Sequence, residues 1–585
     1  MSLPATTPKS CFEFDEFQVD PARRLLLRSG KPLALTPRVF DTLLYFVEHC
    51  GRVIPKEELM KAIWPDAFVE ENNLNQSVSA IRRALGERKG ENRYLVTVPG
   101  HGYRFVSSVR KILSNEELSS TDQVVAKSIA VLPFKPLLEK ERDEALELGM
   151  ADSLIIRLSS SSSDMIVRPL SSVRRYGGLE QDPLSAGREL RVESVLDGSL
   201  QRAGDRIRLS ARLTNVADGR SLWVGTFDEN FTDVFSLQDA ISERVAGALQ
   251  LHLSSDARRE LMKRHTESTQ AYELYLQGRY HWSRLVPNEV RKSIEFYEQA
   301  IAVDPNYALA YTGIAVAYLS LSISSDVKPA DTFPKAKAAV LKALDLDESL
   351  SDAHAYLGFV HFWFDWNWAA AESEAKRGIA LNANSSESHR AYGILLSQLG
   401  RHAEAIIEGE RARELDPLAL ITRTNEALFF YYSGQFAEAE EKLKAALELE
   451  PNFWVALLSI AKVYVAQGKH QQAIEVLTKA RKFSGGSAQP LSMLGYAFAS
   501  MGDRVRAEAI LEELNKLSAE RHVPPYNFAL VYNGLNDDDN TFHWLERSYE
   551  SRDVMLAAFI KADPVWARLQ DDNRFKSLLG RMNLV

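Results

Sequence analysis

The chain has very little cysteine and no clear membrane-spanning run. Cys11 and Cys50 are the only two cysteines in 585 residues, too few for a disulfide framework or a zinc site. This fits a reducing cytoplasm. No signal peptide opens the sequence. The uncharged run 306–325 is long enough for a span, but Ser, Thr, Tyr and Gly dilute it. It also falls in register with the repeat described below, so we expect no membrane segment.

Sequence motifs of catalysis are missing as well. We find no phosphate-binding P-loop, no nucleophile elbow, no HExxH pair and no EF-hand loop. Gly100 and Gly102 resemble the start of a dinucleotide-binding loop. No third glycine follows, however, and the chain continues as a strand rather than a helix. We therefore expect no enzyme, no cofactor and no catalytic or metal site.

Charge is distributed unevenly along the sequence. Residues 1–110 contain 16 Lys and Arg against 13 Asp and Glu, a net of +3. The whole chain has a net charge of −9, which leaves about −12 on the remainder. A polyanion would therefore bind the N-terminal part, whereas the acidic remainder should avoid it. Within residues 76–110 seven basic side chains face two acidic ones, a plausible phosphate footprint.

An amphipathic helix is predicted over residues 72–86. Its apolar residues recur at helical spacing and define one buried stripe: Leu74, Val78, Ile81 and Leu85. Amide and guanidinium groups, which can pair bidentately with purine edges in the major groove, gather on the opposite face. A solvated polar face is the simpler interpretation of such a helix taken alone. The exposed face is expected to hold Asn72, Gln76, Ser79, Ala80 and Arg83, with Arg82 on its flank.

A β-hairpin over residues 94–106 follows this helix directly and favours DNA binding. Two β-rich runs flank Pro99-Gly100-His101-Gly102, a strong turn signal. Thr97 and Arg104 should stand within reach of phosphate, and His101 at the hairpin tip. A helix followed by such a hairpin can place the helix in a groove of DNA and the hairpin against the DNA backbone beside that groove.

Residues 11–109 resemble the OmpR/PhoB-type winged-helix DNA-binding domain. An N-terminal antiparallel sheet, a helix opening at Thr36-Pro37, a second helix after Ile54-Pro55, the IRRAL helix and the TVPGHGYRF hairpin follow the family's order. The resemblance implies a recognition helix over 73–85 and a wing over 94–106. The predicted DNA-binding residues are Asn72, Asn73, Gln76, Ser79, Ala80, Arg82, Arg83, Thr97, His101 and Arg104.

The same resemblance carries two departures. Pro99 stands where the family's wing often has a basic residue, so the resemblance does not imply a phosphate contact at this position. The loop 66–71, at the family's polymerase-contacting position, is acidic here. RNA polymerase is nevertheless an expected partner.

A second domain is predicted over residues 128–255. SIAVLPF is suited to a buried strand and an amphipathic helix follows it; three strand-like runs then precede a closing helix over 235–249. These strings resemble the TolB N-terminal-like α/β domain, which implies an interaction or sensory module. Arg168, Arg174 and Arg175 form either an anion site or, more simply, a solvated loop. The serine run 159–163 suggests a flexible loop.

The last 330 residues contain a 34-residue repeat. Glycines recur at 400, 434, 468 and 502, and alanines at 405, 439, 473 and 507. This period, with small residues at helix contacts and proline at helix boundaries, is the tetratricopeptide signature. We expect about eight repeats from Thr269 to Tyr549 and a terminal cap. The aromatic run 362–368 is interpreted as repeat core rather than as a ligand site.

Together these features predict a multidomain α+β protein. A winged helix-turn-helix domain (1–110), a polar linker (111–127), a TolB-like α/β domain (128–255) and an all-α tetratricopeptide solenoid (256–585) follow in order. With no receiver domain found, we expect a CadC-like one-component transcriptional regulator without a membrane span. It should bind double-stranded DNA, either as one copy or as a dimer. The repeats should bind a protein or peptide partner. The alternative is a protein-interaction scaffold whose winged helix serves only for docking.

Overall fold

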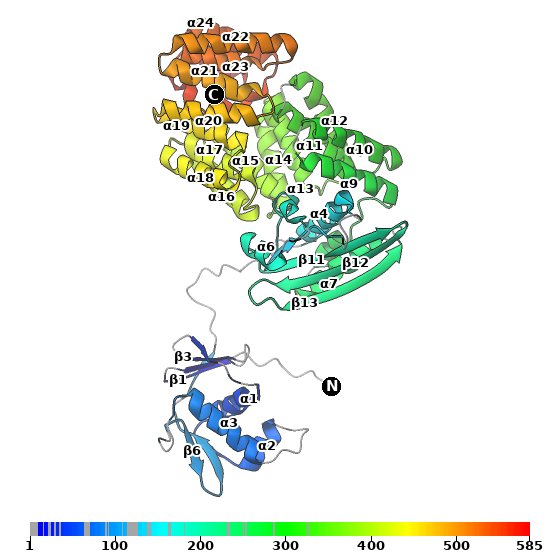
Figure 1. Ribbon diagram of the computed structural model, residues 1–585, viewed down its shortest axis with the longest axis vertical. Helices are drawn as coiled ribbons and strands as arrows, with labels where there is room; N and C mark the ends of the chain where they lie inside the picture. The colour runs from blue at the N-terminus through cyan, green and yellow to red at the C-terminus, as the bar shows by residue number, and fades with distance from the viewer. Residues whose placement is uncertain are drawn as a thin grey trace. The chain divides into compact units, whose positions relative to one another are not determined.

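The chain separates into two compact units, residues 1–124 and 125–585, in a computed structural model (Figure 1). The structure describes residues 10–113 except 16, 21–24, 29–30, 34, 36, 64–70, 88–90, 92 and 108. It also describes residues 127–584 except 137–141, 162–164, 179, 181, 231–233, 250, 252–253, 285–286 and 325–326. The linker predicted over 111–127 is shorter in the structure, because β8 (Arg110–Leu113) pairs with β1 and β9 already begins at Lys127.

The first unit opens with the predicted antiparallel sheet. Its strand order is β4-β3-β2-β1-β8, with β1 (Ser10–Phe14), β2 (Phe17–Asp20), β3 (Leu25–Arg28) and β4 (Lys31–Leu33). Three helices follow, α1 (Pro37–Glu48), α2 (Lys56–Ile63) and α3 (Glu71–Ala84). A second sheet of order β5-β7-β6 closes the unit, with β5 (Val53–Ile54), β6 (Leu95–Val98) and β7 (Gly102–Phe105). Thr36, the predicted helix cap, and residues 66–70 of the acidic loop lie outside the described residues.

Aromatic side chains join these layers into one core. Phe14 of β1 meets Phe105 of β7 edge to face, with ring centroids 5.0 Å apart. Phe46 of α1 packs against Tyr103 of β7 in the same manner. Because both sheets and the helices share this core, the position of the hairpin is fixed relative to α3.

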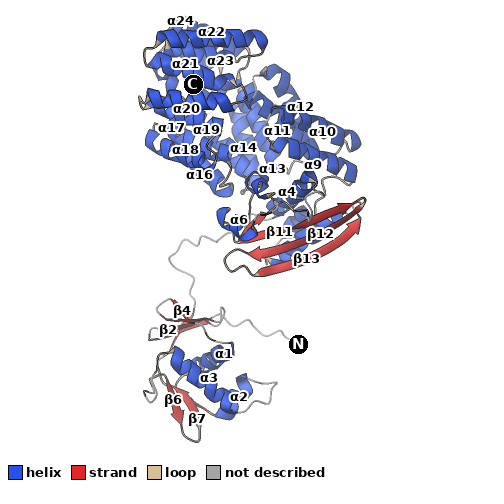
Figure 2. Ribbon diagram, in the orientation of Figure 1, coloured by secondary structure: helices blue, strands red, loops and turns tan. Residues whose placement is uncertain are grey.

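The second unit begins with a mixed five-stranded sheet of order β10-β9-β11-β12-β13. Its strands are β9 (Lys127–Val131), β10 (Met165–Val167), β11 (Ser194–Ala203), β12 (Arg206–Asn215) and β13 (Ser221–Asn230). The last three form the long antiparallel ribbon in Figure 2. Each of the three is ten residues long, and they turn at Gly204 and Gly219, where φ is +60° and +69°. Helices α4 (Glu144–Ser161) and α7 (Val234–Ala248) pack against this sheet.

The predicted serine loop is wrong in its first part. Helix α4 continues through Ser161, because Leu154, Ile155 and Leu158 all bury their side chains on the sheet side. The Ser160 hydroxyl donates to the Ile156 carbonyl at 2.9 Å, which satisfies it within the helix. Residues 162 and 163 lie outside the described residues.

Arg168 lies in neither a solvated loop nor an anion site. Its side chain is buried and donates to the carbonyls of Leu190 (2.9 Å) and Leu415 (2.8 Å). It therefore ties the sheet domain to the end of α16 (His402–Leu415). Burial lowers the pKa of Arg168 to about 10, which still leaves the guanidinium charged at neutral pH. Arg174 and Arg175 are exposed.

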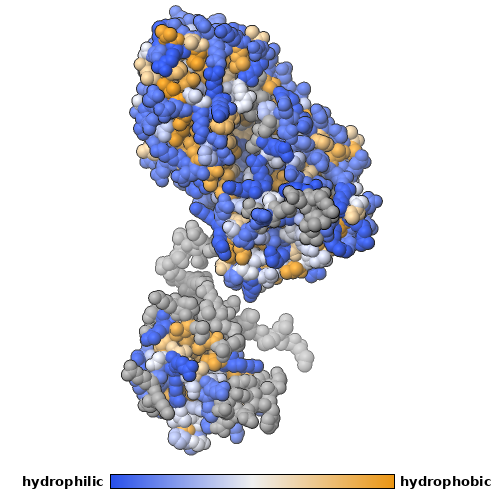
Figure 3. Space-filling view, in the orientation of Figure 1, coloured by the Kyte–Doolittle hydropathy of each residue, from blue (hydrophilic) through white to orange (hydrophobic). Residues whose placement is uncertain are grey.

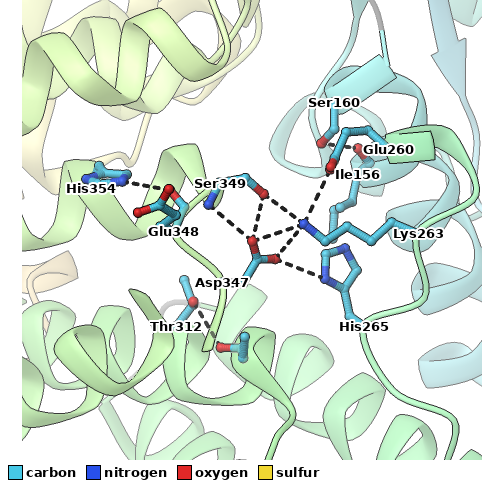
Figure 4. A network of polar contacts seen from close by, with 11 residues as sticks. Ile156, Ser160, Glu260, Lys263, His265, Thr312, Asp347, Glu348, Ser349 and His354 are labelled. Carbon is cyan, nitrogen blue, oxygen red and sulfur yellow. Dashed lines mark hydrogen bonds and ion pairs between the residues drawn. The ribbon is translucent and has the colours of Figure 1, made fainter. Parts of the chain in front are cut away.

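Further polar contacts join the sheet domain to the repeats. Arg279 of α9 (Thr269–Ser283) donates two hydrogen bonds to Asp152 of α4, at 2.7 and 2.9 Å. Figure 4 shows a second contact, in which Lys263, from the stretch that leads from the sheet domain to the first repeat helix, reaches the carboxylate of Asp347 at 2.9 Å and the hydroxyl of Ser349 at 2.8 Å. The sheet domain and the repeats consequently form one body.

Helix pairs build the rest of the second unit, as the 34-residue period predicts. The described residues between 269 and 550 form eight pairs: α9 (Thr269–Ser283) with α10 (Pro287–Val303), α11 (Ala308–Ser324) with α12 (Pro329–Leu346), α13 (Ser351–Val360) with α14 (Trp368–Leu381), α15 (Ser386–Gln398) with α16, α17 (Leu420–Tyr432) with α18 (Phe436–Leu449), α19 (Trp454–Ala466) with α20 (His470–Phe483), α21 (Ala488–Ser500) with α22 (Arg504–Glu520), and α23 (Pro525–Gly534) with α24 (Asp538–Glu550). The uncharged run 306–325 becomes α11, an element of this array.

The repeated small residues have the expected structural roles. Gly400, Gly434, Gly468 and Gly502 all adopt φ between +73° and +83° at the turn inside a pair, where glycine avoids strain. The alanines at 405, 439, 473 and 507 are fully buried. The aromatic run 362–368 also lies in the core, as interpreted from the sequence. Large apolar residues that remain exposed, such as Val505 and Ile407, are scattered among polar ones; Figure 3 shows apolar and polar residues interspersed on one face of this unit.

The segment after α24 differs from a simple end cap. It contains α25 (Val554–Phe559), a 3-10 turn (Pro564–Leu569) and α26 (Asn573–Arg581). α26 does contact α24, since Arg574 pairs with Asp539 at 3.3 Å. The Trp368 indole, however, donates to the Met582 carbonyl at 2.6 Å, so the segment returns to the third helix pair. The C terminus accordingly lies over the array rather than beyond α24 in Figure 1.

Candidate nucleic-acid interface

Helix α3 presents one polar face to solvent. Leu74, Val78 and Ile81 are at most 2% exposed and anchor the opposite face in the core. Gln76 and Arg83 are exposed, and neither has a protein partner among the described residues. Side chains that can pair with base edges therefore project from one surface of a helix held from behind.

Three predicted positions on α3 need refinement. Ala80 is half-buried and packs against the core rather than lying on the exposed face. Ser79 is exposed, and its hydroxyl donates to the Asn75 carbonyl within the helix at 2.8 Å. Asn72 and Asn73 belong to α3, but their side chains lie outside the described residues.

The wing is a tight antiparallel hairpin braced by a third strand. Val96 lies opposite Arg104, and Thr97 opposite Tyr103. Strand β5 pairs with β7 on its other side. This close approach explains Gly102, because a Cβ there would lie 2.0 Å from the Ile54 carbonyl oxygen. The wing thus has little freedom to bend away from the domain.

Three predicted wing residues are solvent-exposed. Thr97 and Arg104 point outward from β6 and β7, and His101 lies at the turn. The His101 backbone amide donates to the Val98 carbonyl at 3.0 Å and closes that turn. Arg104 has no protein partner among the described residues, so its charge is available to a phosphate.

Arg82 lies on the flank of the polar face, where it contacts the wing. It is half-buried, and its guanidinium donates to the Leu95 carbonyl at 2.9 Å and to the Thr97 hydroxyl at 3.0 Å. These contacts join α3 to β6. Arg82 therefore positions the wing, whereas the adjacent Arg83 is directed to solvent.

Two further contacts between helix and wing escaped the sequence analysis. The Tyr103 hydroxyl donates to Asn75 Oδ1 at 2.6 Å. The buried carboxylate of Glu87 accepts from the backbone amides of Tyr94 and Leu95, at 3.3 and 3.4 Å. Glu87 had counted as an acid within the basic footprint, and no periodic signal distinguishes it from a surface glutamate. Together with Arg82, these contacts hold α3 and the wing as one rigid surface.

Comparisons with known proteins agree with this geometry. Residues 30–105 match the family model described as transcriptional regulatory protein, C terminal. Residues 430–488 match a tetratricopeptide repeat model. A winged helix of the regulatory type, followed by an array of tetratricopeptide repeats, defines the class: a DNA-binding transcriptional regulator.

Similar proteins extend that assignment along the chain. The transcriptional regulator HilA of Salmonella typhi is 23% identical over 437 residues, which cover 73% of this chain and 75% of HilA. The transcriptional activator CadC of Escherichia coli (strain K12) is 33% identical over 95 residues, 16% of this chain and 19% of CadC. A protein of Rhizobium meliloti (strain 1021), named as a candidate adenylate cyclase, is 29% identical over 240 residues, 40% of each chain.

Two kinds of feature are absent from the described residues. Within them, no helix is both long and apolar enough to cross a membrane. The same residues contain no group of three or more His, Cys, Asp or Glu side chains arranged to hold a metal ion.

Proposed function

We propose that this protein is a one-component, cytoplasmic transcriptional regulator that reads double-stranded DNA with α3 and its wing. The observation that carries the proposal is the exposed pair Gln76 and Arg83 on a helix that Arg82 locks to the wing. α3 enters the major groove, where an amide and a guanidinium discriminate bases. The wing lies along the adjacent backbone or minor groove with Thr97, His101 and Arg104.

The remaining predicted residues contribute to this interface in different ways. Asn72 and Asn73, at the start of α3, contact DNA through their amides, and Ser79 and Ala80 allow close approach to the bases. Arg82 contributes by holding Thr97 toward the backbone. RNA polymerase is the proposed downstream partner, and two copies on adjacent half-sites are consistent with a domain that reads one half-site.

The second unit senses a signal or binds a protein partner and performs no catalysis. Its sheet domain resembles TolB N-terminal modules in sequence, and its repeats build an array of the kind that binds proteins. HilA, which shares similarity over most of this chain, supports a regulatory role for the whole protein.

The test is selection of duplex DNA from a random library by the full chain, followed by affinity measurements over a range of salt. We expect an enriched motif and an affinity that falls steeply as salt rises. A full chain that enriches no motif and binds without salt dependence would favour the scaffold alternative. In that case deletion of residues 1–110 should leave partner binding intact.

A further inference from the structure

The first helices of the repeat pairs are buried on two sides. In α19 every residue from Ala456 to Tyr464 is buried, whereas its partner α20 buries only Ala473, Leu477 and Ala480. α21 shows the same excess over α22. A helix that contacted only its neighbours in the stack would expose one face. The inner side of the array is therefore covered.

The covering element is residues 551–584, which we call the closing segment. It leaves α24 at Arg552, which has a left-handed φ of +54°. Its apolar side chains are nearly all inaccessible, and Trp566 is 0% exposed. It departs from the repeat pattern, because α25 has only six residues and a 3-10 turn (Pro564–Leu569) follows it.

A buried carboxylate anchors the segment at its centre. Asp563 is 1% exposed and lies 2.7 Å from Lys462 Nζ of α19. The Tyr431 hydroxyl of α17 donates to its other oxygen at 2.9 Å. Lys462 also lies over the Phe559 ring, 4.0 Å from its centroid. The first helices of two repeat pairs, α17 and α19, thus bind the same carboxylate.

Helix α23 binds the residues that follow Asp563. Asn533 of α23 donates to the Val565 carbonyl at 2.7 Å. The Trp566 indole donates to the Tyr526 hydroxyl of the same helix at 3.1 Å. Backbone, carboxylate and aromatic side chain are therefore each bound by a separate group on the inner face.

The aromatic run of the third repeat receives the far parts of the segment. Arg552 lies over the Trp366 ring at 3.9 Å and donates to the Phe364 carbonyl at 3.4 Å. Trp368 binds the Met582 carbonyl. Trp366 adopts a left-handed φ of +55°, strain that these contacts offset.

We propose that the inner face of the array is a recognition surface for a short protein segment that forms a 3-10 turn, as Pro564–Leu569 does, with an acidic residue at the start of the turn, a proline after it and, three positions after the acid, a large aromatic side chain. The closing segment occupies this surface as an intrachain ligand, and a partner segment of the same chemistry replaces it. This rests on the proposed partner-binding role of the array. A buried ion pair contributes little net stability compared with apolar packing, so Lys462 and Asp563 specify what binds more than they hold the fold together.

The experiment uses the full chain and a fluorescent peptide of residues 558–572. In the variant Asp563→Asn with Trp566→Ala, the closing segment loses its anchors while Lys462, Tyr431 and Tyr526 remain. We expect this variant to bind the peptide at least tenfold more tightly than the unchanged chain. Adding Lys462→Met should abolish the gain, and a peptide carrying Asp563→Asn should bind more weakly. The control Asp571→Asn, an exposed carboxylate on the same segment, should behave as the unchanged chain.

Equal peptide binding by the unchanged chain and the folded variant would overturn the proposal, and so would no binding by the folded variant. Circular dichroism establishes whether the variant is folded. If it is not, native-state hydrogen exchange on the unchanged chain decides. If the amides of the closing segment exchange at a lower opening free energy than those of α19 and α21, the segment is a separable ligand. If all three exchange only when they unfold together, the proposal is contradicted. None of these measurements involves DNA, so their outcome is independent of the DNA-binding proposal.

Discussion

Arg82 on α3 and Thr97 on β6 are joined by a hydrogen bond of 3.0 Å between guanidinium and hydroxyl. Arg83, the next residue, is exposed and has no protein partner in the described part of the chain. Two adjacent arginines of the same chemistry therefore serve different purposes. One fixes the angle between helix and wing, and the other is available to DNA.

Replacing Arg82 and Arg83 one at a time should distinguish the structural role of Arg82 from the DNA-binding role of Arg83. Arg83→Ala should cost about 1–3 kcal/mol of binding to the selected duplex and relax the choice at one base pair. It should leave thermal unfolding of the first unit unchanged. Arg82→Ala should instead lower the stability of that unit by about 1 kcal/mol and weaken binding to every sequence. Fluorescence anisotropy with selected and scrambled duplexes, and calorimetry of unfolding, measure both.

Arg83→Lys is the matched control for charge. It keeps the positive charge but loses the planar fork that pairs with a guanine edge, so it should lose sequence choice while keeping most non-specific affinity. If Arg83→Ala weakened all duplexes equally, Arg83 would be a backbone contact.

Arg104 on the wing should contribute to affinity without selecting sequence. Arg104→Ala removes one phosphate contact, so the slope of log affinity against log salt should decrease in magnitude by about 1. Arg93→Ala is a suitable comparison, because Arg93 already pairs with Asp15 at 3.0 Å; its effect on the slope should be smaller. A slope that Arg104→Ala leaves unchanged would exclude a phosphate contact there.

Local patterns in the sequence predict the elements, and long-range contacts decide how they are used. The stripe of Leu74, Val78 and Ile81 is enough to predict α3 and its buried face. The 34-residue spacing predicts the eight helix pairs, because each pair repeats the same local packing.

The misses involve partners far apart in the sequence. Arg168 binds the Leu415 carbonyl 247 residues away, and Asp563 binds Lys462 101 residues away. Neither contact leaves a periodic trace in one sequence. The family resemblance implies a DNA contact for Arg82, whereas the structure shows its guanidinium bonded to Leu95 and Thr97 of the wing.

Arg168 should be essential for the junction between the sheet domain and the repeats. Arg168→Met should lower the free energy of unfolding by about 3–5 kcal/mol, because it leaves the buried carbonyls of Leu190 and Leu415 without a donor and removes a cation near the buried carboxylate of Asp416. Urea unfolding of the full chain measures this change. Arg175→Met, at an exposed position of the same short segment, should change stability by less than about 0.5 kcal/mol. Similar effects of both variants would remove the special role of Arg168.

His265 at this junction should make the second unit sensitive to acid. Burial lowers its pKa to about 4, and Lys263 and Arg157 act in the same direction, while Asp347 opposes them. Figure 4 shows the imidazole directed toward Asp347, with Nδ1 3.8 Å from Oδ2. Because the folded pKa lies below the unfolded value of 6.5, the fold favours the neutral ring. The associated stability is complete above pH 6.5 and is lost as the pH falls toward 4, by at most about 3 kcal/mol.

His265→Gln should therefore flatten the loss of stability between pH 6.5 and pH 4, measured by urea unfolding of the full chain at several pH values. His101→Gln, on the exposed wing of the other unit, is the matched control and should leave that profile unchanged. Glutamine cannot take up a proton in this range, so any acid sensitivity that persists in His265→Gln belongs to other groups. If the whole sensitivity persisted, the pKa of His265 would be the same in the folded and unfolded chain, and the attraction of Asp347 would balance the cost of burial.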